Sequence, residues 1–108
     1  MKRLLKWFVS ATAFRILLVI LLLAGLLLEK QLIACANLLG GVRSLYRWEG
    51  KVCNDAEVVM IAKTSGEKLD AAISVLTESH SYDCPCVTSW EITAGNEAYL
   101  KWVGEETA

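Results

Sequence analysis

The sequence predicts an α+β sandwich with an antiparallel sheet, on three observations. Residues 32–48, which contain Val, Leu, Tyr and Trp, and residues 52–63, with Val58-Val59-Met60-Ile61 at their centre, flank the turn candidate Glu49-Gly50, a pattern typical of a β-hairpin. Apolar residues then recur at helical spacing from Leu69 to Leu76. A strand-like stretch at residues 87–92 and a short apolar segment close the chain. With a strand and a helix before the hairpin, the order becomes β-α-β-β-α-β plus a C-terminal helix, which is a ferredoxin-like sandwich.

The elements before the hairpin fall in an apolar, basic segment, residues 1–30. Residues 16–28 carry no charge, and as a helix they span about 20 Å, less than the roughly 30 Å hydrocarbon core of a bilayer. Extending the helix back to residue 7 provides the length but places Arg15 inside the membrane, at a cost of about 2.5 to 3.5 kcal/mol. Residues 7–28 are therefore a marginal membrane span.

Three interpretations of this segment stay open. It is a signal segment ending in a lipoprotein-like Leu-Ile-Ala-Cys box at Cys35, or an uncleaved membrane anchor in residues 7–28. In the third interpretation, residues 4–13 form a first strand and residues 14–30 a first helix, whose apolar outer face then needs a partner. Residues 31–108 form the main domain in every case.

Composition limits the function classes. The chain of 108 residues suits one domain, and its net charge of -1 conceals a basic start and an acidic body. An acidic body argues against a nucleic-acid partner, which requires clustered Lys and Arg. A single histidine, with no phosphate-binding loop and no nucleophile-base arrangement, leaves little room for catalysis. We therefore expect that the protein is not an enzyme.

The densest group of potential metal ligands lies in residues 80–86. This segment contains the only histidine, His80, and the only proline, Pro85, together with Cys84 and Cys86. Imidazole and thiolate are ligands that soft and borderline metal ions prefer, and two cysteines two residues apart on a strand point to the same face. With Cys35 they supply enough ligands for a tetrahedral site. The alternative is that the cysteines are small buried apolar residues.

Four blocks of sequence indicate a family. They are Ile-Ala-Cys-Ala-Asn at 33–37, Ser-Leu-Tyr-Arg-Trp-Glu-Gly-Lys at 44–51, His80 and Tyr82 with Pro85 downstream, and Gly95-Asn96 followed by Tyr99, Leu100 and Trp102. In this order and spacing, over about residues 26–103, the chain resembles the CutA divalent-cation tolerance family.

The resemblance implies a non-catalytic homotrimer of ferredoxin-like subunits. Bacterial members are linked to tolerance of copper and other divalent ions, and animal members to membrane anchoring of acetylcholinesterase. The family's copper-binding residues fall on Cys35 and His80, and on a carboxylate position that Cys86 occupies here, with Cys84 as a further thiol. We therefore expect copper or a similar divalent ion as the ligand. Which ion is bound, and whether tolerance means buffering or sensing, stay open.

This chain departs from the family pattern in two further places. Ser81 replaces a proline, and residues 4–25 replace the usual first strand and amphipathic start of the first helix, so that a mis-called start is an alternative. We expect a cytoplasmic protein, with anchoring in a membrane through the N-terminal segment as the alternative. Aromatic side chains are expected to pack in the core or at the trimer interface rather than to bind a ligand. These residues are Tyr46, Trp48, Trp90, Tyr99 and Trp102.

Overall fold

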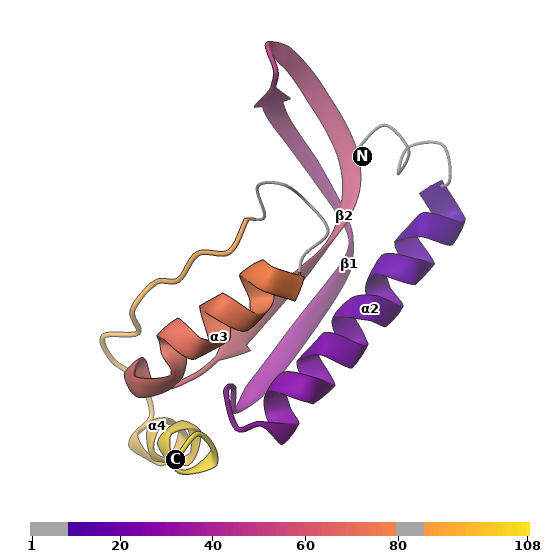
Figure 1. Cartoon of the computed structure of the whole chain (residues 1–108). Helices are drawn as coiled ribbons and strands as arrows, with labels where there is room; N and C mark the ends of the chain where they lie inside the picture. The colour runs from indigo at the N-terminus through magenta and orange to yellow at the C-terminus, as the bar shows by residue number, and fades with distance from the viewer. Residues whose placement is uncertain (1–8, 80–85) are drawn as a thin grey trace. The chain divides into compact units, whose positions relative to one another are not determined.

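The computed structural model of the protein describes residues 9–79 and 86–108 (Figure 1). Its elements, in chain order, are α2 (Val9–Glu29), β1 (Cys35–Trp48), β2 (Lys51–Lys63), α3 (Gly66–Ser79) and α4 (Glu97–Glu106). They fall into two compact units. One unit holds residues 9–22 and Asn37–Ile61, and the other holds Leu23–Ala36 and the described part of Ala62–Ala108.

Helix α2 is one continuous helix from Val9 to Glu29. The predicted first strand at residues 4–13 is therefore wrong for residues 9–13, and residues 4–8 lie outside the described residues. Residues 9–13 continue the helix that follows them, because each new residue adds a hydrogen bond within the same segment, whereas a strand needs a neighbouring strand.

The end of α2 is fixed by its own backbone. The Gln31 N–H donates to the Leu28 carbonyl at 3.0 Å and the Leu32 N–H donates to the Leu27 carbonyl at 2.9 Å, while Gln31 has a positive φ of 58°. This is the Schellman arrangement, which satisfies carbonyls that a helix end otherwise leaves without partners. The helix therefore stops just before the strand β1.

The predicted hairpin is confirmed. Strands β1 and β2 form a two-stranded sheet and are joined by Glu49 and Gly50, with φ of 51° and 77°. Two consecutive residues with positive φ give the turn that matches the twist of an antiparallel pair. Gly41 within β1 also has a positive φ of 71°, as expected for a bulge or bend inside a long strand.

The buried core described for the chain lies in the second unit. There the Ala34 N–H donates to the Lys63 carbonyl at 2.7 Å, and the Thr64 hydroxyl donates to the Leu32 carbonyl at 2.7 Å, so the start of β1 and the end of β2 are held together. Ala72 from α3 and Val103 from α4 are buried in the same unit. The buried residues are Ala24, Leu27, Ile33, Ala34, Ala72, Val103 and Thr107.

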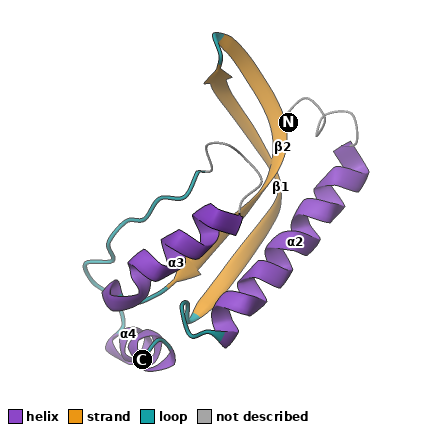
Figure 2. Cartoon of the chain, in the orientation of Figure 1, coloured by secondary structure: helices purple, strands orange, loops and turns teal. Residues whose placement is uncertain are grey.

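The predicted strand at residues 87–92 is not formed in the single chain. Residues 86–96 have no regular secondary structure and are drawn as a loop between α3 and α4 (Figure 2). A strand is defined by hydrogen bonds to a neighbour, and the sheet of the described chain consists of β1 and β2. The predicted closing segment, by contrast, is the helix α4.

The predicted localisation needs correction. Among residues 9–79 and 86–108, no helix has the length and apolar character that crossing a membrane demands, so the expected anchor in residues 7–28 is wrong. The last two turns of α2 instead bury Ala24 and Leu27, which are 6% and 0% exposed, in the core of the second unit. These two side chains therefore contribute to the packing of the second unit.

Candidate metal centre

The thiol of Cys35 is the predicted ligand that the structure positions best. Cys35 is the first residue of β1 and is half-buried. The preceding residue, Ala34, is tied by its N–H to the end of β2. The Cys35 Sγ lies 3.5 Å from the Tyr99 Oη, within hydrogen-bond distance for sulfur. The sheet therefore presents the thiol to the C-terminal helix.

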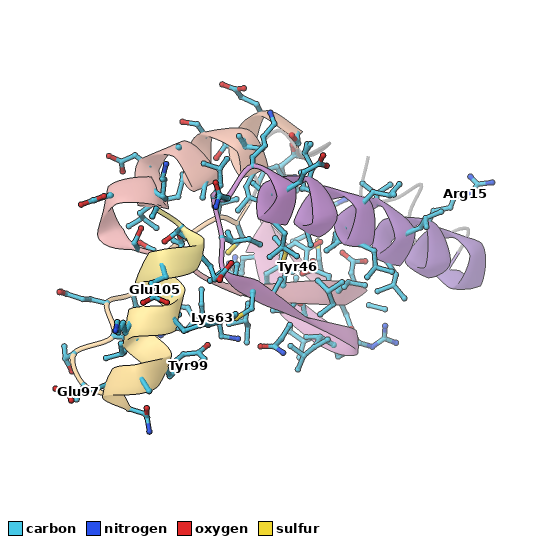
Figure 3. The ribbon with its side chains drawn as sticks, turned by 90° about the horizontal axis from the view of Figure 1, so that it is seen from below. Arg15, Tyr46, Lys63, Glu97, Tyr99 and Glu105 are labelled. Atoms are coloured by element: carbon cyan, nitrogen blue, oxygen red, sulfur yellow. The ribbon has the colours of Figure 1, made fainter. Side chains whose placement is uncertain are left out.

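Tyr99 reaches Cys35 because α4 starts at a well-formed cap. The side chain of Asn96 accepts a hydrogen bond from the Tyr99 N–H at 3.1 Å, which satisfies one of the N–H groups that the start of a helix leaves without a partner. The Tyr99 ring also lies against the Trp102 ring, with centroids 5.8 Å apart and an angle of 35° between the planes. Figure 3 shows Tyr99 projecting from α4 on the side where Lys63 lies.

The hydrogen bond with Cys35 raises the pKa of Tyr99 above its usual value, with desolvation and the charge of the Cys35 thiolate adding to the rise. All three effects disfavour the phenolate. Tyr99 is therefore a neutral hydroxyl that can donate a hydrogen bond to sulfur. A donor of this kind orients a metal-binding thiolate and adjusts its basicity.

The other predicted ligands are not brought to Cys35 in the described part of the chain. Cys86 is exposed and lies at the start of the loop at residues 86–96. His80 and Cys84 lie outside the described residues. Within the described ranges, no group of three or more His, Cys, Asp or Glu side chains is close enough to hold a metal ion. The pair of Cys35 and Tyr99 is what the structure brings together.

The chemistry of the predicted donors fits a soft or borderline ion. Two thiolates and an imidazole are suitable ligands for Cu(I) or Zn(II) and poor ligands for Mg²⁺ or Ca²⁺. Both described members, Cys35 and Cys86, are free thiols. A thiol must lose its proton to bind a metal, so binding at these residues releases protons.

Tyr46 belongs to a second polar group, on the hairpin, which the sequence analysis did not identify. Its hydroxyl donates to the carboxylate of Asp55, and the Ser44 hydroxyl donates to Glu57 at 3.0 Å. Burial raises the pKa of Tyr46 well above its usual value, and the hydrogen bond to Asp55, the Asp55 charge and the nearby Cys53 thiol raise it further. Tyr46 thus has a polar partner within the sheet.

The other predicted packing aromatics remain accessible in the single chain. Trp90 is 77% exposed, and Trp48, Tyr99 and Trp102 are exposed to about the same lesser extent. Tyr99 is the residue whose role differs most from the expectation, because it is the partner of the Cys35 thiol. No signal within the sequence indicates this contact, because 64 residues separate Cys35 and Tyr99 along the chain.

The helices and the hairpin define an α+β protein, and comparisons with known proteins support the ferredoxin-like class. Residues 20–106 match the model of the family described as CutA1 divalent ion tolerance protein. The chain is 42% identical over 85 residues to the Protein CutA 1, chloroplastic, of Oryza sativa, covering 79% of this chain and 48% of the relative. It is 41% identical over 81 residues to the Divalent-cation tolerance protein CutA of Pectobacterium atrosepticum, covering 75% and 74%.

A solved structure shows the same fold. The divalent cation tolerance protein (Cut A1) of Thermus thermophilus superposes with a TM-score of 0.79 at 33% identity, covering 83% of this chain and 87% of that one. This chain belongs to the CutA1 divalent ion tolerance family, which confirms the resemblance and the fold class. The chain spans about half the length of the rice relative. That relative is named a chloroplastic protein, so the prediction of a cytoplasmic location is also withdrawn.

Proposed function

We propose that this chain is a non-catalytic, metal-responsive protein that binds copper or a similar ion through Cys35, His80 and Cys86, with Cys84 as a possible fourth ligand. Membership of a family named for divalent ion tolerance supports a relation to metal ions. The observation that carries the site is the Cys35 thiol, half-buried at the start of β1 and hydrogen-bonded to Tyr99.

The two described thiols of the proposed site lie in different kinds of structure. Cys35 is held by the paired ends of β1 and β2, whereas Cys86 opens a loop without regular secondary structure. A metal that requires both thiolates therefore has to hold the first residue of this loop close to Cys35, and any rearrangement of the loop that this needs lowers the affinity. Replacing the family's carboxylate by Cys86 favours thiolate-preferring ions, because sulfur is the softer ligand.

Titration of the reduced protein with Cu(I) and Zn(II) tests the site. Removing one ligand, in His80→Ala or in Cys86→Ser, is expected to weaken binding by about tenfold or more. Cys53→Ser is the matched control, because Cys53 is a free, half-buried cysteine outside the proposed set. Unchanged affinity in both ligand variants would contradict the site.

We also propose that the chain forms a homotrimer through its strands, the alternative function being a trimeric scaffold. Apolar side chains on both strands are exposed, among them Leu45 at 69% and Val52 at 70%. In the loop at residues 86–96, Trp90 and Ile92 are 77% and 56% exposed at alternate positions, the spacing of one strand face. Exposed apolar surface of this extent is typical of an interface.

Light scattering of the purified chain checks the assembly. A mass of three chains, or of a multiple of three, is expected, and Trp90→Ser should weaken the assembly by removing a large apolar contact. A wild-type chain that stays monomeric would contradict the trimer. A trimer that binds no Cu(I) or Zn(II) would favour the scaffold over the metal-binding function.

A further inference from the structure

One face of α2 is apolar and uncovered in the chain. Leu18, Val19 and Leu22 are 47%, 57% and 68% exposed, and Leu26 on the next turn is 41% exposed. The helix is 21 residues long, and its buried positions Ala24 and Leu27 lie on the opposite side by helical periodicity. A helix with an apolar face of this kind requires a partner on that face.

The exposed face has the spacing of a helix-pairing seam. Five residues of this face follow one another at intervals of three, four, three and four, which is the heptad pattern of paired helices. They are Arg15, Leu18, Leu22, Gly25 and Glu29. All five are exposed. A Cβ added at Gly25 would meet nothing within 4 Å. The glycine therefore leaves room for the side chain of a facing helix to approach the backbone.

The two charged residues of the seam determine what fits it. Arg15 and Glu29 stand seven residues to either side of Leu22, about 10 Å in each direction along the helix axis. An antiparallel pair of identical helices with its two-fold axis at Leu22 therefore sets Arg15 of each copy beside Glu29 of the other. In a parallel pair Arg15 would face Arg15. Within the described residues, no ion pair joins Arg15 or Glu29 to another side chain, and Figure 3 shows Arg15 pointing away from the helix.

We infer that α2 pairs antiparallel with α2 of a second copy of this chain. Leu22 packs on Leu22 at the two-fold axis, Leu18 packs over Gly25 of the other copy, and two Arg15–Glu29 pairs close the ends. A two-fold interface of this kind is self-complementary, so that one patch supplies both sides. The contact uses α2 and not the strands proposed for the trimer. When the α2 contacts of one trimer all close on the same second trimer, the assembly has dihedral symmetry and twice the mass of the trimer.

Light scattering of the full chain from micromolar to millimolar concentration tests the inference. Leu22→Lys brings two ammonium groups together at the axis, and the assembly is expected to fall to half the mass of the wild type. Leu28→Lys is the matched control, because Leu28 is exposed on the same helix but lies about 100° away from the seam. The control should keep the wild-type mass. A wild type with the mass of Leu22→Lys at every concentration would overturn the inference, since the face would then be covered by something else.

A charge exchange tests the antiparallel direction. Arg15→Glu or Glu29→Arg alone places like charges together at both ends, and the dissociation constant of the doubled species is expected to rise by about tenfold. The double variant Arg15→Glu/Glu29→Arg should restore it. A double variant as weak as the single ones would overturn the antiparallel arrangement. A circular dichroism spectrum of each variant serves as the control that it is folded. If the chain does not form a trimer, the test still applies, because α2 pairing then joins two single chains instead of two trimers.

Discussion

Thr107 joins the end of α4 to the start of α3, and replacing it by valine is expected to destabilise the second unit. Thr107 is 1% exposed. Its hydroxyl donates to the Val103 carbonyl at 2.8 Å, and it lies within hydrogen-bond distance, 3.0 Å, of the Ser65 hydroxyl. Valine has the same shape but no hydroxyl, so Thr107→Val removes the hydrogen bonds and leaves a buried carbonyl at the helix end without a partner.

The magnitude follows from these contacts. An unsatisfied buried acceptor costs about 1 to 3 kcal/mol, and we expect Thr107→Val to lower the free energy of unfolding by about 2 kcal/mol. For a domain of this size, that corresponds to a fall in Tm of roughly 10 °C. Thr107→Ser keeps the hydroxyl and loses one buried methyl group, which costs about 0.8 kcal/mol, or a fall of about 5 °C.

Thermal unfolding followed by circular dichroism, at one protein concentration, separates the two variants. The serine variant should be the more stable of the two. A valine variant as stable as the wild type, or more stable than the serine variant, would refute the claim that the Thr107 hydroxyl holds α4 to α3.

Three further predictions concern the hairpin and the thiol site. Burial and the hydrogen bond to Asp55 raise the pKa of Tyr46 in the folded state, so the folded chain keeps this proton above pH 10, where the unfolded chain loses it. The free energy of unfolding should therefore fall as the pH rises beyond about 10. Urea unfolding at several pH values should show a less steep fall for Tyr46→Phe than for the wild type. Gly50→Ala places a side chain at φ 77° and should lower the free energy of unfolding by about 1 kcal/mol or more, as thermal unfolding measures. Gly40→Ala is the control and should be nearly neutral, because a Cβ at Gly40 meets nothing within 4 Å. Equal losses of stability in the two variants would contradict this prediction. Cys35→Ser should move the pKa of Tyr99 because the thiol is the largest cause of its rise, and an ultraviolet phenolate titration that shows no change would contradict the Cys35–Tyr99 contact.

Local chemistry explains which parts of the fold could be predicted. Glu49 and Gly50 specify a hairpin turn because both must adopt positive φ, and the strands on either side carry residues that favour extended backbone. The end of α2 at Glu29 lies close to the end of the apolar run. By contrast, residues 9–13 combine alanine with β-branched residues, and their helical state depends on continuation from the helix that follows.

The candidate site was predicted only in part, because its contacts are remote in sequence. Cys35 was identified from its family block, and its thiol chemistry depends on Tyr99, which comes from another element. No periodicity links a residue at the start of a strand to one in the first turn of a C-terminal helix. The grouping of Cys35 with His80, Cys84 and Cys86 stays a prediction.

The most direct test of the metal site is the absorption of the reduced protein loaded with Co(II) as a spectroscopic substitute for Zn(II). A thiolate bound to cobalt gives an intense sulfur-to-metal charge-transfer band in the near ultraviolet, so the band reports Cys35 and Cys86 as ligands. We expect the wild type and Cys53→Ser to show it, Cys35→Ser and Cys86→Ser to lose much of its intensity, and Tyr99→Phe to shift it. A band of equal intensity in Cys35→Ser and the wild type, or no band in the wild type, would contradict the proposed site.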